Sequence, residues 1–227
     1  MDNGFTRRSF SGGGPKEYKR GYTNFAKCKI DLSMKPMIPR KETEFWVKKA
    51  IQELRIKGEE LRILDIFSGS GCIGIAILKH IKNSKVDFAE IDKNLIKQIK
   101  LNLKLNKINS RRYKLVQSDV FKNINGSYDY VFANPPYIPL KNKHLVQKSV
   151  LDYESHLALF GGNDGLLYIK KFLESARKYL KRGGKTYMEF DHLQKTELEK
   201  LLEKLKYKNY KIYKDQFKKW RYICIKN

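Results

Sequence analysis

Short apolar runs alternate with segments of helical periodicity from residue 61 to residue 205, and this alternation constrains the fold more than any other feature. The apolar runs have the length and composition of strands and cover residues 61–66, 85–90, 112–117, 128–133 and 185–190. Helical patterns cover residues 72–81, 94–106, 164–180 and 194–205. Alternation of this kind is typical of a parallel sheet with helices on both faces.

Two further apolar runs, at residues 210–214 and 220–225, follow the last helical pattern and fit the strands of an antiparallel hairpin. Together with the earlier runs they predict a seven-stranded, mostly parallel α/β sheet of the Rossmann-like type, with helices on both faces and a C-terminal antiparallel hairpin. We therefore expect residues 61–227 to form the main domain.

The residues before this pattern divide into two parts. Residues 1–20 contain Ser-Gly-Gly-Gly-Pro and several basic side chains but few apolar ones, which predicts a flexible basic arm. Residues 21–60 predict an extended segment that ends near Pro39, then a helix whose apolar side chains recur at helical spacing. We expect that helix to pack on the main domain.

The composition excludes several classes of protein. No apolar run approaches the ~20 residues of a membrane-spanning helix, and the N-terminus has no apolar stretch of signal-peptide type. The three cysteines lie far apart and form neither a disulfide framework nor a C-x-x-C metal clip, so no metal site is predicted. These features predict a cytoplasmic protein without membrane contact, and a monomer is the default expectation.

The formal net charge of +24 is the one extreme of the composition. A field of this sign attracts anionic partners, above all RNA and ribosomal surfaces. Lysines spread over the whole chain can equally serve to solvate helix faces. The charge therefore leaves both explanations open, and it indicates a class of partner and not a reaction.

A candidate ligand site follows the first strand, which ends at Asp65-Ile66 and continues into the loop Phe67-Ser68-Gly69-Ser70-Gly71. Ligands of open α/β sheets bind beyond the carboxyl ends of the strands, where glycines let the backbone approach them. The second strand ends at Glu90, where a carboxylate can accept hydrogen bonds from ribose hydroxyls. After the third strand, Asp119 can accept from an adenine amino group while Val120 or Phe121 packs on the ring.

Acids at three successive strand ends indicate an adenosine ligand, and the loop lacks the Gly-Lys-Ser/Thr ending of a phosphate cradle. S-adenosylmethionine therefore fits better than ATP, with S-adenosylhomocysteine as the product. Phe67 departs from the usual Gly-x-Gly-x-Gly pattern by placing a ring where the first glycine normally stands. The predicted cofactor-binding residues are Asp65, Phe67, Ser68, Gly69, Ser70, Gly71, Glu90, Asp119, Val120 and Asn134.

The sequence Asn134-Pro135-Pro136-Tyr137 follows directly after the fourth strand. Consecutive prolines fix φ and remove two backbone donors, which leaves carbonyl oxygens free to accept hydrogen bonds. The Asn134 oxygen and the Pro135 carbonyl can hold both hydrogens of a planar NH2 group and aim its lone pair at a sulfonium methyl. Tyr137 would stack on the planar group. We predict Asn134, Pro135, Pro136 and Tyr137 as catalytic residues of methyl transfer to a planar nitrogen.

With these motifs the chain resembles the HemK/PrmC family of release factor glutamine methyltransferases over roughly residues 37–205. The narrower signals are Ile-Pro-Arg-Lys-Glu-Thr-Glu at residues 38–44, Tyr153-Glu154 followed by Ala-Leu-Phe-Gly-Gly-Asn-Asp-Gly-Leu at residues 158–166, and Glu189 followed by Gln194. The resemblance implies that the acceptor is the glutamine of the Gly-Gly-Gln motif of class I peptide chain release factors, methylated on its side-chain nitrogen (N5).

The chain departs from the family pattern in two places. Ser155 stands where the family usually has proline, and only about 35 residues precede the resemblance, too few for the family's helical N-terminal domain. Arg40 and Glu154 fit either a role in the acceptor site or an ion pair that holds the wall of the site.

Two other functions stay open from the sequence. Asn-Pro-Pro-Tyr is shared with adenine-N6 and guanine-N2 methyltransferases, so an RNA or DNA base N-methyltransferase is the first alternative. The second is a catalytically silent RNA- or ribosome-binding protein on the same fold. A catalytically silent protein would have no physical reason to keep Asp65, Glu90 and Asn134 together.

Overall fold

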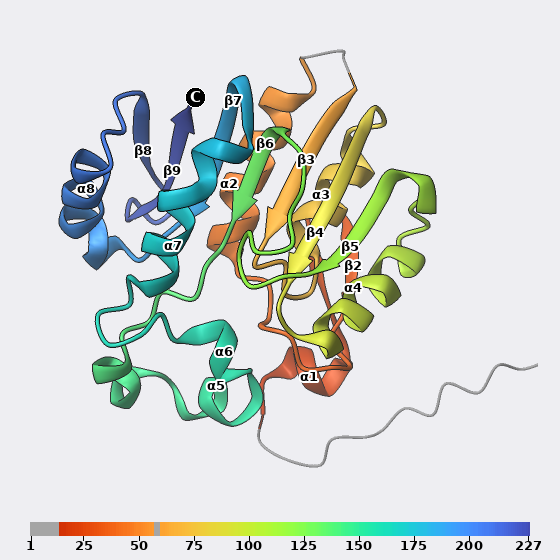
Figure 1. Cartoon of the computed structure of the whole chain (residues 1–227). Coiled ribbons are helices and arrows are strands. Elements are labelled where there is room, and N and C mark those ends of the chain that lie inside the picture. The colour runs from red at the N-terminus through yellow and green to blue at the C-terminus, as the bar shows by residue number, and fades with distance from the viewer. Residues whose placement is uncertain (1–13, 57–59) are drawn as a thin grey trace, which may run out of the picture.

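The structure, a computed structural model, describes residues 14–56 and 60–227, and it contains the predicted seven-stranded sheet (Figure 1). The strands of this sheet are β3 (Leu61–Ile66), β4 (Ser84–Glu90), β5 (Tyr113–Gln117), β6 (Tyr128–Ala133), β7 (Leu180–Glu189), β8 (Tyr210–Lys214) and β9 (Trp220–Lys226). Their order is β5-β4-β3-β6-β7-β9-β8, with β9 antiparallel to β7 and β8 and every other pair parallel. The predicted Rossmann-like fold with a C-terminal antiparallel hairpin is confirmed.

The direction of strand addition reverses between β3 and β6, the switch point at which open α/β sheets bind ligands. From β3 the chain builds outward through β4 to β5, and then returns to place β6 on the other side of β3. The arrowheads of β3, β4 and β6 point toward the same end of the molecule (Figure 1). Residues that follow these strands are therefore brought together.

Helices cover both faces of the sheet. One face packs against α2 (Lys41–Leu54), α3 (Cys72–His80) and α4 (Lys93–Leu105), and the other against α7 (Leu167–Ala176) and α8 (Lys195–Lys204). Successive side chains of a strand point to opposite faces, so on β6 Phe132 packs in the first core and Val131 in the second. In the first core the Trp46 ring of α2 stacks on Phe132, with ring centroids 6.1 Å apart.

The remaining elements are short and lie before the sheet or at its loops. They are α1 (Lys16–Arg20), β1 (Tyr22–Phe25), β2 (Cys28–Asp31), α5 (Lys148–Tyr153), α6 (His156–Leu159) and the 3-10 turns η1 (Ser110–Arg112), η2 (Leu140–Leu145), η3 (Arg177–Tyr179) and η4 (His192–Gln194). None of the helices in the described ranges has the length and apolar character that crossing a membrane requires.

The predicted basic arm lies outside the described residues as far as residue 13, and its described end differs from the prediction. Lys16–Arg20 forms a helix, and Tyr18 is buried with its hydroxyl donating to the Pro36 carbonyl at 2.5 Å. The Tyr18 ring also stacks on Tyr153, with centroids 6.0 Å apart. One aromatic anchor orders this short segment, and an average over its polar composition does not reveal it.

Three segments differ in detail from the predicted elements. The extended segment after residue 21 contains a hairpin of β1 and β2, whose turn places Ala26 and Lys27 at positive φ. β7 begins at Leu180 and not at residue 185, because a register shift opposite Tyr128 accommodates the Lys-Arg-Gly-Gly stretch that resembles a turn. The helix predicted at residues 164–180 is shorter, since α7 begins at Leu167.

Candidate active site

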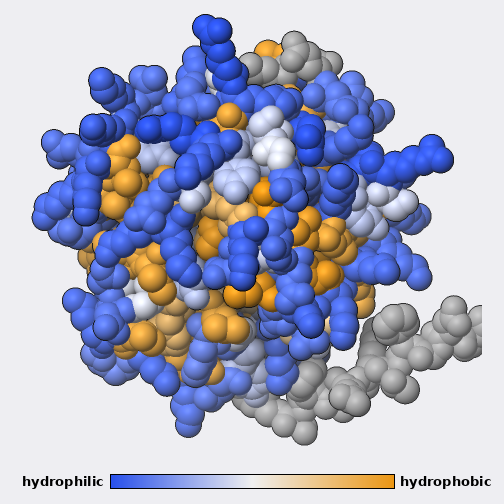
Figure 2. Space-filling model, viewed as in Figure 1, coloured by the Kyte–Doolittle hydropathy of each residue, from blue (hydrophilic) through white to orange (hydrophobic). Residues whose placement is uncertain are grey.

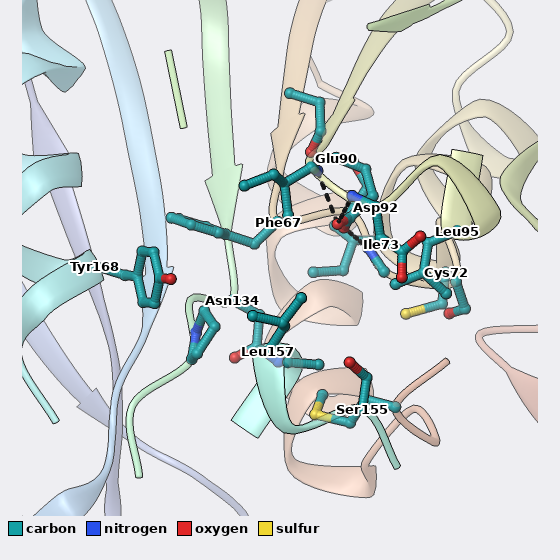
Figure 3. A pocket seen from close by; sticks show the side chains of 18 of the residues that line it. Phe67, Cys72, Ile73, Glu90, Asp92, Leu95, Asn134, Ser155, Leu157 and Tyr168 are labelled. Carbon is teal, nitrogen blue, oxygen red and sulfur yellow. Dashed lines mark hydrogen bonds between the residues drawn. The ribbon is translucent and has the colours of Figure 1, made fainter. Parts of the chain in front are cut away.

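A pocket opens at the switch point, between the loop after β3 and a covering segment that includes Ser155, Leu157 and Ala158 (Figure 3). The space that it encloses, open solvent included, is about 960 Å³. Of the predicted site residues, those that line it are Phe67, Ser68, Gly69, Ser70, Glu90, Asp119, Val120, Asn134 and Pro136. Four others, Asp65, Gly71, Pro135 and Tyr137, are not part of the lining.

The loop after β3 turns beneath the pocket with three residues in the left-handed region, Phe67 (φ 57°), Gly69 (φ 54°) and Gly71 (φ 78°). Gly71 is required for two reasons. Its φ is positive, and an added Cβ would lie 3.0 Å from a methyl carbon of Ile99. Phe67 adopts this conformation at a steric cost, and its ring lies edge-on to Tyr168 with centroids 5.9 Å apart. The ring is thus accommodated on the pocket wall beside α7.

Glu90, at the end of β4, holds the loop through backbone donors. Its Oε2 accepts from the Gly69 amide at 2.8 Å, and its Oε1 accepts from the amides of Ile91 at 2.8 Å and Asp92 at 3.1 Å. Burial raises the pKa of Glu90, and these backbone donors oppose that rise. A carboxylate has about four acceptor positions, so one position on Oε2 stays available to a ligand hydroxyl.

Asp119 and Val120 follow β5 and give the pocket one acidic and one apolar group. The Asp119 side chain is 42% exposed, and its carboxylate lies 3.5 Å from the Lys171 ammonium. Val120 is buried with φ at 50°, and its carbonyl accepts from the Ser118 hydroxyl at 2.9 Å. The positive φ turns the chain just after the strand, where the two side chains reach the pocket.

Asp65 lies behind the loop and supports it from below. Its Oδ2 accepts from the Gly74 amide of α3 at 2.9 Å, while its Oδ1 is buried and has no hydrogen-bond partner in the described part of the chain. Burial raises the pKa of Asp65 to about 8. The structure therefore places Asp65 where it orients α3 against the loop and not where it can touch a ligand directly.

Asn134 and Pro136 bring the end of β6 into the pocket. Nδ2 of Asn134 donates to Oγ1 of Thr43 at 3.4 Å, and its Oδ1 accepts no hydrogen bond from the described residues. Figure 3 shows Asn134 between Tyr168 and Leu157, on the side of the pocket facing the glycine loop. A free amide oxygen on this wall can accept a hydrogen from a polar acceptor group.

Tyr137 lies behind this wall. Its hydroxyl donates to Oε1 of Glu189 at 3.3 Å, and its ring packs against the second core. Burial and the neighbouring Glu189 raise the pKa of Tyr137 far above its ordinary value, so the hydroxyl keeps its proton. The structure does not bring Tyr137 to the pocket wall, where the sequence interpretation has it stacking on the acceptor.

Thr43 and Glu189 have no predicted role in the site, although both lie in segments that carry the family resemblance. Thr43 lines the pocket, and its hydroxyl donates to Glu189, which is 1% exposed. Glu189 ends β7 as Glu90 ends β4. An acid at the end of an otherwise buried strand is the signal that could have identified it.

Arg40 and Glu154 form an ion pair at the edge of the pocket. One guanidinium nitrogen of Arg40 lies 2.6 Å from Oε1 and 2.8 Å from Oε2 of Glu154, whose side chain is fully buried. The pair joins the start of α2 to the segment that precedes Ser155, which lines the pocket. Of the two explanations left open by the sequence, this contact fits the ion pair that holds the wall.

The fold and the pocket match known methyltransferases. The model of the methyltransferase small domain family matches residues 50–169. The solved structure of a methyltransferase from Pyrococcus furiosus is similar with a TM-score of 0.61 and 21% identity, and the match covers 87% of each chain. The ribosomal protein L11 methylase from Lactobacillus delbrueckii subsp. bulgaricus is similar with a TM-score of 0.61 and 18% identity, over 86% of this chain and 82% of that chain. Together these features define a class I methyltransferase that uses S-adenosylmethionine.

Sequence comparison identifies the family of the chain within this class of methyltransferases. It is 34% identical to the release factor glutamine methyltransferase of Flavobacterium psychrophilum, over 93% of this chain and 75% of the relative. It is 33% identical to the release factor glutamine methyltransferase of Lactococcus lactis, over 93% of this chain and 77% of the relative. The chain belongs to the release factor glutamine methyltransferase family.

Proposed function

We propose that this protein transfers the methyl group of S-adenosylmethionine to the side-chain amide nitrogen (N5) of the glutamine in the Gly-Gly-Gln motif of class I peptide chain release factors. The observation that carries the proposal is the Asn134 oxygen, which lies on the pocket wall without a donor among the described residues. The names of the relatives support the same acceptor.

The cofactor, when bound, supplies a methyl group activated by a sulfonium sulfur. We assign one ribose hydroxyl to the remaining acceptor position of Glu90 and the adenine amino group to Asp119. Val120 offers an apolar contact to the adenine ring. Gly69 leaves the backbone of the loop open to close approach, and Asp65 acts from behind by orienting α3.

The acceptor amide is a poor nucleophile, because its nitrogen lone pair is delocalised into the carbonyl group. In the proposed mechanism the Asn134 oxygen accepts an N–H group of the glutamine amide, which draws electron density onto its nitrogen. The Pro135 carbonyl, which the sequence predicts as the second acceptor, does not line the pocket, so no contact is assigned to it. Asn134 begins a stiff segment, since the two prolines that follow it fix φ. Orientation of the amide by this segment supplies much of the rate enhancement.

The charge of +24 supports an additional, nonspecific attraction to RNA or to a ribosomal surface. Figure 2 shows hydrophilic residues over most of the visible face. We also propose a monomeric enzyme, which is the default expectation from the sequence. Methyl transfer measured across a range of salt concentrations separates this attraction from recognition of the acceptor loop.

The deciding experiment is transfer of labelled methyl from S-adenosylmethionine to three acceptors in parallel: purified release factor, its Gly-Gly-Ala variant and total RNA. An Asn134→Ala enzyme serves as the control for contaminating activity. The proposal expects label on the release factor with the intact motif and none on the Gly-Gly-Ala variant. Label on RNA alone would contradict it and favour a base N-methyltransferase.

A further inference from the structure

Asn134 can present either end of its side-chain amide to the pocket, and the two orientations are chemically opposite. With Oδ1 toward the pocket it accepts a hydrogen bond from an NH2 group, and with Nδ2 toward the pocket it would only donate. Oxygen and nitrogen have nearly the same shape, so steric contacts do not choose between them. The choice depends on the group behind Asn134, which is the Thr43 hydroxyl at 3.4 Å.

The Thr43 hydroxyl has a single proton, and the structure commits it to Glu189. The Thr43 oxygen lies 2.7 Å from Oε2 of Glu189, and Nε1 of Trp46 donates to the same oxygen at 2.7 Å. Tyr137 donates to the other oxygen, Oε1, at 3.3 Å. An ionised carboxylate only accepts hydrogen bonds, so Glu189 offers no proton to Thr43.

Burial raises the pKa of Glu189, while hydrogen bonds from Trp46 and Thr43 and the charge of Arg221 oppose that rise. Thr43 still donates to Glu189 when the Glu189 carboxyl group is protonated. Oε2 already receives two donors, so Oε1 is the oxygen with room for a proton, and it faces the Tyr137 hydroxyl, which can accept.

We propose that Thr43 and Glu189 are positioning residues that orient the side-chain amide of Asn134. Because Thr43 gives its proton to Glu189, it can only accept from Asn134, which turns Nδ2 backward and Oδ1 into the pocket. The chain of hydrogen bonds therefore has one direction, from Asn134 through Thr43 to Glu189. This inference rests on the proposed function and deepens it, since it explains how the acceptor site is set to receive an NH2 group.

The hydrogen bonds that link Asn134, Thr43 and Glu189 are already in place, and largely buried, in the protein without an acceptor. Thr43 is 2% exposed, and Trp46, which fixes the shared oxygen of Glu189, is fully buried. The Trp46 ring lies in an aromatic stack with Phe132 and Tyr187, at centroid distances of 6.1 Å and 6.4 Å. Hydrogen-bonding groups that are already in place need no reorganisation when the reaction begins.

The test compares four substitutions in the full chain. Thr43→Val keeps the shape of the side chain and removes the hydroxyl, and Thr43→Ala gives the same comparison if valine prevents folding. Thr43→Ser restores the hydroxyl. Thr186→Val is the matched control, because it makes the same change at a buried threonine whose hydroxyl has no hydrogen-bond partner in the described part of the chain.

Two readouts are needed. The first is kcat for methylation of release factor at saturating cofactor, with KM for the release factor and Kd for the cofactor measured beside it. The second is independent of activity: the hydrogen-exchange rate of the Asn134 side-chain NH2 group, followed by NMR and assigned with the Asn134→Ala variant. A purely structural role for Thr43 would change the melting temperature without changing the exchange at Asn134.

The expected result for Thr43→Val is a loss of roughly 10- to 100-fold in kcat, with KM and cofactor Kd within about twofold of the wild type. Exchange at Asn134 should become about tenfold faster, because its hydrogen bond is lost. Thr43→Ser should return both values toward the wild type, while Thr186→Val leaves kcat within roughly threefold and the exchange at Asn134 unchanged.

Unchanged kcat and unchanged exchange in both Thr43→Val and Thr43→Ala would overturn the inference. Equal losses of kcat in Thr43→Val and Thr186→Val would also overturn it, since they would indicate a general effect on packing. Failure of the wild-type enzyme to label release factor would contradict the proposed function alone. The exchange rates would then still decide whether Thr43 orients Asn134.

Discussion

The two halves of the pocket are built from different kinds of contact. In the half that we assign to the cofactor, called the cofactor half, the Glu90 carboxylate accepts from backbone amides, and its contact to Gly69 spans only 21 positions of the sequence. In the half that we assign to the acceptor, called the acceptor half, Asn134 contacts Thr43 across 91 positions, and Thr43 contacts Glu189 across 146. These contacts of the acceptor half join side chains only.

This difference predicts how each half responds to substitution. A site held by backbone groups keeps its donors whatever side chains the loop carries, provided that each residue can adopt the required φ. Phe67 is an example, because it takes a position at φ 57° that usually belongs to glycine. A site held by side chains loses its geometry with the removal of one hydroxyl or one amide. Substitutions in the two halves should therefore affect different kinetic constants.

The largest expected effect is that of Asn134→Ala on the chemical step. Removal of the amide oxygen should lower kcat by about 100- to 1,000-fold, as loss of one preorganised hydrogen-bonding group does in other enzymes. Cofactor Kd, measured by calorimetry, should stay within about threefold of the wild type. A loss of cofactor affinity as large as the loss of kcat would show that the two halves do not act separately.

Glu90→Ala should weaken cofactor binding and leave the chemical step nearly unchanged. It removes the acceptor position for the ribose and the partner of the Gly69 amide, so cofactor Kd should rise by about 10- to 100-fold. At saturating cofactor, kcat should change by no more than about threefold. Glu60→Ala is the matched control, since the Glu60 side chain is 60% exposed and pairs with Lys85 at the surface. A variant whose kcat stays low at any cofactor concentration would count against this division.

Asp65→Asn tests the cofactor half through its stability. Burial raises the pKa of Asp65 to about 8, whereas in the unfolded chain a free aspartate has a pKa of about 4. The folded protein therefore binds a proton that the unfolded chain has released, and the free energy of unfolding falls as pH rises from about 4 to about 8. Asn has no such titration, so the wild type should lose on the order of 5 kcal/mol relative to the variant across this range, at about 1.4 kcal/mol per pH unit.

Urea unfolding of both proteins at pH 5 and pH 9 measures this difference. Subtraction of the variant removes the contribution of every group that titrates equally in the two proteins. A difference that is the same at both pH values would mean that Asp65 is ionised in the folded protein over the whole range.

Most of the fold could be predicted because strands buried on both faces leave continuous apolar runs. Residues 61–66 and 128–133 coincide with β3 and β6 for this reason. The predicted start of β7, at residue 185, lies too far along the chain, since Gly183 and Gly184 interrupt the pattern and only the pairing with β6 extends the strand across them. The sequence does not predict helix α1, because burial of one side chain, Tyr18, orders it.

The cofactor half could be located from the sequence because its residues directly follow consecutive strands, and parallel strands end at one edge of the sheet. Asn134 could be located in the same way. The contacts that orient Asn134 could not be inferred, because no local pattern relates Thr43 on α2 to Glu189 at the end of β7. The position of Tyr137 depends on the same distant partner, since its hydroxyl turns toward Glu189.

Synthesis on the ribosome produces the residues of the two halves of the pocket at different times. Glu189 ends β7, and β9 pairs along the outer edge of that strand, where the Phe190 amide donates to the Arg221 carbonyl at 2.9 Å. A nascent chain that has just emerged from the ribosome through β6 already carries the loop after β3, Glu90 and Asp119. It lacks both Glu189 and the strand that secures it. The residues that we assign to the cofactor are thus all made before Glu189 and β9, on which the proposed orientation of Asn134 depends.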